Sequence, residues 1–96
     1  MTQEQYYSLN IGDVIYNVRT NKVVKLESYW SNTKERKEDD CITAPILGED
    51  YQFDNVAAKE CANWDYITDN SPIEVQFLIM KIRFFELEQF VHSRLH

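Results

Sequence analysis

The stretch VIYNVRTNKVVKLESYW, residues 14–30, decides the fold because it predicts a β-hairpin. One side of residues 14–18 carries apolar residues at every second position, and one side of residues 23–30 carries Val24, Leu26, Ser28 and Trp30, which is the period of a half-buried strand. The polar run between the two segments suits a turn, since Asn21 tolerates a left-handed backbone conformation. We expect one common buried face made of Val14, Tyr16, Val24 and Leu26.

A third strand is predicted over residues 41–47, where the apolar side chains that align are Ile42, Ala44 and Ile46. Pro45 places this strand at a sheet edge or marks a bulge, because proline donates no ladder hydrogen bond. Residues 1–10 are expected to be a polar lead-in, and residues 31–40, which contain no apolar side chain, a solvated loop.

The sequence pattern of residues 48–70 is more ambiguous. A turn at residues 48–50 leads into a short strand over residues 51–53. Residues 54–70 leave two alternatives open, namely a short helix over residues 56–61 or a further strand.

Residues 72–94 predict one long C-terminal helix. Ser71 and Glu74 have the spacing of a capping box, with Pro72 at the first helical position, and no later Gly or Pro interrupts the segment. One apolar stripe recurs at helical spacing along its whole length: Ile73, Phe77, Met80, Phe84, Leu87, Val91 and Leu95. A second stripe lies roughly opposite along the first turns: Val75, Leu78, Ile79, Ile82 and Phe85.

The second stripe has two interpretations. It either packs within the domain's own sheet and loops, or forms a face that meets a homodimer mate or a partner protein. Light scattering would separate the two interpretations.

Length and composition indicate one small domain spanning residues 1–96, because a hydrophobic fraction of 44% is too high for a disordered chain. The sequence shows no secretory signal and no apolar run near the ~20 residues of a membrane span, so we expect a cytoplasmic protein without membrane contact. Cys41 and Cys61 are then expected to be reduced thiols. The expected class is α+β: a small bent antiparallel sheet or SH3-like barrel over residues 9–68, closed by the long C-terminal helix.

Charge is distributed unevenly along the chain. The net charge is −6, and residues 38–74 contain ten acidic side chains and one basic one, Lys59. An anionic segment speeds association with a cationic surface and disfavours nucleic acid, whose phosphates are bound by Lys and Arg. We therefore expect the partner to be a basic surface of a host protein, with no direct nucleic-acid contact. The candidate contact residues are Glu38, Asp39, Asp40, Glu49, Asp50, Tyr51 and Asp54.

No common catalytic or cofactor motif occurs in the sequence, which lacks glycine-rich phosphate loops, a nucleophile elbow and a zinc-protease helix. His92 and His96 lie four residues apart, but two ligands are too few for a closed metal site. No spacing recommends a Cys–His nucleophile pair. We expect no enzymatic activity, no catalytic residue, no metal site and no cofactor.

Residues 9–16, LNIGDVIY, and residues 20–26, TNKVVKL, resemble the opening hairpin of SH3-like small barrels. With residues 75–85, VQFLIMKIRFF, the layout is similar to small uncharacterised proteins encoded by phages and prophages of Bacteroidetes. The chain departs from their pattern after Pro45, and it carries Ile79 where those proteins tend to have a His. The resemblance implies a viral or mobile-element origin and no particular activity.

Two classes of function are compatible with these features. The first is a non-enzymatic inhibitor or adaptor that covers a basic nucleic-acid-binding surface as a nucleic-acid mimic, for instance a phage-encoded anti-defence protein such as an anti-CRISPR. The second is an SH3-like accessory module that binds nucleic acid or assembles in a phage or host complex. The charge distribution favours the first class.

Overall fold

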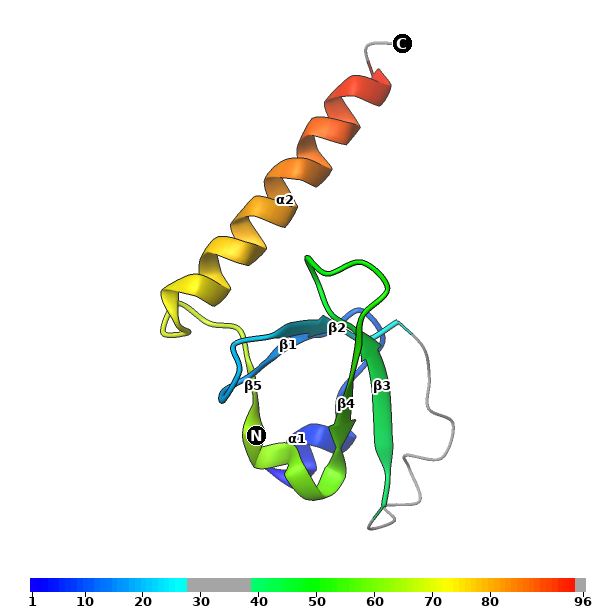
Figure 1. The fold of residues 1–96 in the computed structure, drawn as a ribbon, viewed down its shortest axis with the longest axis vertical. Helices are drawn as coiled ribbons and strands as arrows, with labels where there is room; N and C mark the ends of the chain where they lie inside the picture. The colour runs from blue at the N-terminus through cyan, green and yellow to red at the C-terminus, as the bar shows by residue number, and fades with distance from the viewer. Residues whose placement is uncertain (28–38, 95–96) are drawn as a thin grey trace.

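Two small antiparallel sheets and one long helix make up the structure (Figure 1). The computed structural model describes residues 1–27 and 39–94. Its elements are, in chain order, α1 (Gln3–Tyr7), β1 (Val14–Asn17), β2 (Val23–Lys25), β3 (Cys41–Pro45), β4 (Phe53–Ala57), the 3-10 helix η2 (Ala58–Asn63), β5 (Trp64–Tyr66) and α2 (Ile73–Arg94).

The first sheet has the strand order β2-β1-β5, and the second sheet pairs β3 with β4. An isolated bridge between Val24 and Ile46 connects the two sheets. The predicted α+β class, with antiparallel strands and a C-terminal helix, is confirmed. Among the described residues these pairings do not by themselves close a barrel.

The hairpin of β1 and β2 buries both of its faces. Ile15 pairs with Val24 and Tyr16 pairs with Val23, and partners across antiparallel strands share a face. Ile15, Val24 and Leu26 therefore enter the main core, whereas Tyr16 and Val23 enter a second cluster. The sequence predicts a single buried face made of Val14, Tyr16, Val24 and Leu26. That prediction is wrong, because alternation cannot reveal the register when both faces of a hairpin are apolar.

The main core lies between the two sheets, with Trp64 of β5 as its largest fully buried side chain. The predicted alignment on β3 is confirmed, since the buried side chains of this segment are Ile42, Ala44 and Ile46. Pro45 is paired with Phe53 at the end of the two-stranded sheet, where a missing donor is tolerated.

The first residues of the chain fold onto this core as α1 and are not the expected polar lead-in. Thr2 and Gln5 form a capping box, the sequence signal that identifies this helix. Tyr6 is fully buried, and its hydroxyl donates to the Val56 carbonyl at 2.9 Å. Burial raises the pKa of Tyr6 far above its ordinary value. The Met1 ammonium donates to two backbone carbonyls of the segment that contains η2 and β5.

Residues 51–70 combine the elements that the sequence left as alternatives. Tyr51 occupies a turn, so the strand predicted over residues 51–53 begins only at Phe53 and continues to Ala57 as β4. The 3-10 helix η2 follows directly, and β5 then pairs with β1. A short helix and a further strand are both present.

The bounds of α2 agree with the predicted helix over residues 72–94, but the helix projects from the body instead of lying across it (Figure 1). The molecule is therefore elongated, with extents of 49 × 28 × 22 Å. The Ser71 hydroxyl accepts a hydrogen bond from the Thr68 N–H at 2.8 Å, and the Glu74 carboxylate accepts one from the Asn21 side chain at 3.2 Å. The predicted capping-box side chains thus bond the helix start to the preceding loop and to the hairpin turn.

Candidate functional site

One side of the first three turns of α2 seats the helix on the body. Val75 is only 1% exposed and packs with Tyr16 and Val23, and partly buried Leu78 and Ile79 pack against the same cluster. We define the seated face of α2 as Val75, Leu78, Ile79 and the half-buried Ile82.

The seated face contains four of the five residues predicted as a possible dimer or partner surface. The structure places Val75, Leu78 and Ile79 against the chain's own hairpin, which matches the alternative, intramolecular interpretation. The physical reason is that β1 and β2 present apolar side chains on the face that the main core does not use. Phe85, the fifth predicted residue, lies beyond the body and is exposed.

The opposite side of α2 is apolar and open to solvent along its whole length. We define this open face as seven large side chains that are between 48% and 66% exposed: Ile73, Phe77, Met80, Phe84, Leu87, Phe90 and Val91. Single exposed hydrophobic residues are ordinary, but a contiguous row of seven on one helix face is typical of an interaction surface. The sequence stripe predicted this row, and only the structure shows that it faces away from the body.

The turn between β3 and β4 approaches α2 closely. A Cβ built on Gly48 would lie 3.1 Å from the Leu78 Cδ1 atom, and Gly48 has a φ of +86°. Glycine is the residue best suited to both conditions, since it tolerates a left-handed backbone and adds no side chain. Gly48 thus allows the turn to pack beneath the helix and helps to set the position of α2 on the body.

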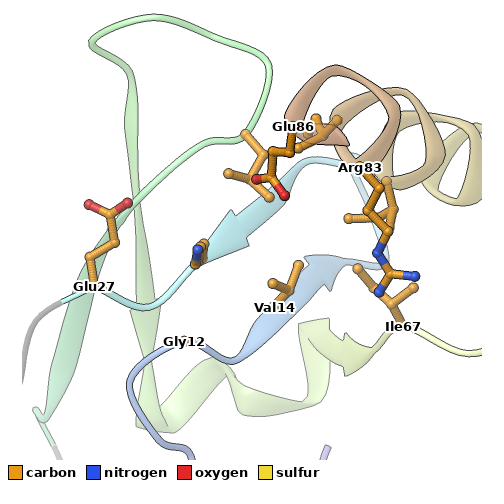
Figure 2. Close-up of a pocket in the computed structure, with 10 residues that line it drawn as sticks. Gly12, Val14, Glu27, Ile67, Arg83 and Glu86 are labelled. Atoms are coloured by element: carbon orange, nitrogen blue, oxygen red, sulfur yellow. The ribbon is translucent and has the colours of Figure 1, made fainter. Parts of the chain in front are cut away.

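A groove opens where α2 leaves the body, with a volume of about 470 Å³. Figure 2 shows Arg83 and Glu86 reaching from α2 toward the hairpin, with Val14 and Ile67 beneath them and Glu27 on the far side. The groove is an open wedge with an apolar floor and a rim of both charge signs. Because its rim carries both charge signs, the groove does not select a ligand by charge. It lies where the seated face of α2 ends.

The predicted acidic contact set is only partly available on the surface. Asp40 is buried, and its carboxylate accepts a hydrogen bond from the Tyr7 hydroxyl at 2.9 Å, so its assignment as an exposed contact is wrong. Glu49 is exposed but forms an ion pair with Lys22 at 2.9 Å, which places a positive charge beside its carboxylate. Tyr7, which forms this hydrogen bond, lies 33 residues from Asp40 in sequence, so no local pattern indicates that the two residues meet.

The remaining members of the acidic set differ in exposure. Asp39 and Asp50 are exposed, whereas Asp54 is half-buried and its carboxylate accepts from the Asn55 N–H. Glu38 lies outside the described residues. Of the described acidic residues in the predicted set, Asp39, Glu49 and Asp50 are therefore the exposed ones.

The β3–β4 turn also exposes two aromatic side chains. Tyr51 is 93% exposed with a φ of +59°, and Phe53 is exposed as well. A non-glycine residue in the left-handed region is strained, and such strain concentrates at functional positions. Tyr51 follows the exposed Asp50 in sequence and precedes Phe53 by two residues, so this turn is the part of the predicted acidic surface with the features of a protein contact.

The described residues offer little chemistry for catalysis. Cys41 is exposed as a residue, but its Sγ atom is partly buried. This partial burial, together with the nearby Glu60 and Asp54 carboxylates, raises the pKa of the thiol and disfavours the reactive thiolate. Cys61 is buried and is not bonded to Cys41. Within the described ranges, no three His, Cys, Asp or Glu side chains gather as a metal site would require.

In the part of the chain that the structure describes, no helix combines the length and the apolar character needed to cross a membrane. No protein-family model, curated protein or solved structure matches the chain. The interpretation of its function therefore rests on the geometry of the open face and of the β3–β4 turn.

Proposed function

We propose that this protein is a small, non-enzymatic protein-binding module and that the open face of α2 is its contact surface. The observation that carries the proposal is the row of seven exposed, large apolar side chains on a helix whose other side is already packed against the body. A helix needs only one apolar stripe to hold it in place, and the seated face supplies that stripe.

The area of the open face supports a protein partner over a small ligand. An amphipathic helix that presents apolar anchors at intervals of three and four residues is a standard mode of helix-in-groove recognition. Burial of each large apolar side chain contributes about 1.5–3 kcal/mol relative to exposure. The row contains three phenylalanines, Phe77, Phe84 and Phe90, and aromatic residues are enriched at protein interfaces.

A basic partner is the form of this proposal that the charges favour. Residues 1–72 carry a net charge of −6, whereas residues 73–96 are neutral. An acidic body beside an apolar contact surface raises the association rate with a cationic protein. Asp50 and Tyr51 on the β3–β4 turn would then supply secondary contacts, and a nucleic-acid-mimicking inhibitor of a host protein is one protein of this kind.

The test is capture from an extract of the organism that encodes the protein, with the purified chain as bait. The triple variant Phe77→Gln, Phe84→Gln, Leu87→Gln should lose its captured proteins, because it removes three central anchors of the open face. Its melting temperature should stay within a few degrees, since exposed substitutions change stability by about 0.5 kcal/mol or less.

The matched control is Gln89→Glu, which changes an exposed position of α2 outside the open face. It should leave capture unchanged. A triple variant that captures the same proteins as the parent would contradict the proposal. For the basic-partner form, Asp39→Lys with Asp50→Lys should weaken capture, and the parent's capture should weaken as salt rises.

A further inference from the structure

We propose that the partner of the open face is a second copy of this chain, so that two α2 helices pair along it to form a two-fold homodimer. The inference rests on the proposed function and names a second copy, which carries the same net charge of −6, as the occupant of the open face. A basic protein on this face is the alternative outcome of the test. It differs from the dimer face considered from the sequence, because the seated face is occupied within each copy.

The spacing of the open face is that of a coiled-coil seam. Ile73, Phe77, Met80, Phe84, Leu87 and Val91 follow at intervals of four, three, four, three and four residues. That alternation averages 3.5 residues and assigns these side chains to the a and d positions of a heptad, which pack into a facing helix of the same period. Within the described residues, α2 is the only helix long enough to supply the facing seam.

The body does not obstruct such a pairing. Val75 and Ile82 are seven residues apart and occupy the f position of the same heptad, which lies opposite the seam. Because the body packs on the f side, each copy keeps its sheets on the outside of the helix pair. The projection of α2 away from the body leaves the C-terminal turns accessible as well (Figure 1).

The area available on one copy matches what a stable dimer needs. Aromatic side chains bury about 150–250 Å² each, so a side chain that is roughly 60% exposed leaves on the order of 100 Å². The seven residues of the open face then offer on the order of 700 Å² per copy, close to the ~800 Å² per partner of a standard interface. A monomer that left this area exposed would exceed the usual size of a surface apolar patch, which is roughly 300–600 Å².

Charge complementarity also allows self-association. Residues 73–96 contain three acidic and three basic side chains, so two α2 helices do not repel each other although the whole chain is acidic. The net charge of −6 belongs to residues 1–72, outside α2.

Adjacent phenylalanines provide a matched test. Phe84 is 66% exposed and lies in the seam, whereas Phe85 is 59% exposed and lies outside it. Sedimentation equilibrium of the full chain at about 100 μM should show a dimer for the parent and for Phe85→Glu. This concentration exceeds the micromolar dissociation constants of the weakest standard-size interfaces. Phe84→Glu should raise the dissociation constant at least about 100-fold, because a charge replaces a central anchor in both copies. Phe84→Leu should restore the dimer.

Circular dichroism separates dissociation from unfolding, and Leu87→Glu provides a second seam variant should Phe84→Glu fail to fold. A monomeric parent, a dimer that survives both seam variants, or equal losses for Phe84→Glu and Phe85→Glu would each overturn the inference. A monomeric parent whose capture of another protein still depends on the open face would overturn the homodimer while the proposed function stands. Capture that is unaffected by the seam variants would remove the proposed function itself.

Discussion

Both sides of α2 are apolar, but one side packs against the body and the other is exposed to solvent. Val75 on the seated face is buried, while Phe77, two residues further along, is 61% exposed. The seated face is short and mainly aliphatic, and it ends where the body ends. The open face is longer and richer in aromatic residues. The comparison shows that an apolar stripe on a helix is buried only where the rest of the chain reaches it.

The largest expected effect comes from placing a charge on each side of the helix. Val75→Asp should destabilise the protein by at least about 3 kcal/mol, because an unpaired carboxylate would be buried in the second cluster. Phe77→Asp should change the stability of the monomer by about 0.5 kcal/mol or less. Urea unfolding at low protein concentration measures both. Equal destabilisation by the two variants would break the distinction between the faces.

A smaller effect sharpens the account of how the helix is seated. Gly48→Ala should cost about 2 kcal/mol, since it strains a left-handed backbone and forces Leu78 to move. Gly12→Ala has a similar φ of +94° but no atom within 4 Å of the added Cβ, so it should cost only about 1 kcal/mol of backbone strain. Thermal unfolding gives both values. If the two costs are the same, the turn does not determine where α2 sits.

The smallest expected effect extends the comparison to two tyrosines of the body. Tyr7→Phe removes the hydroxyl that donates to buried Asp40 and should cost about 1 kcal/mol. Tyr51→Phe should leave stability unchanged, because that side chain is 93% exposed. The same unfolding measurement applies to both variants. An unaffected Tyr7→Phe variant would indicate that Asp40 is satisfied without this bond and would reopen its role in an acidic contact surface.

The sequence predicted elements well where one local period dominates. The hairpin, the alignment on β3 and the bounds of α2 follow from alternation, a turn segment and the absence of helix breakers. α1 was missed because five residues give too short a period, although the Thr2–Gln5 capping pair was visible. The register of the hairpin was wrong by one residue, since both of its faces are apolar.

The candidate site was less predictable than the fold. Both apolar stripes of α2 were visible in the sequence, but the sequence did not indicate which of them the body would cover. The acidic set was predicted because a loop without apolar residues and the turn at Gly48 should leave it exposed. Asp40 is instead buried and bonded to the Tyr7 hydroxyl, and Glu49 pairs with Lys22. Both contacts join residues more than twenty positions apart, and local patterns contain no information about such pairs.

The sequence by itself determined the class of the fold, the length of α2, the presence of two apolar stripes on it and the net charge of −6. These are properties of local periodicity and composition, which do not depend on how distant segments meet. Only the tertiary structure decided which stripe is seated, which carboxylates remain exposed and where the helix leaves the body. Those outcomes depend on which distant segments meet, because among the described residues the cluster that seats α2 takes only Val75, Leu78 and Ile79 from the helix.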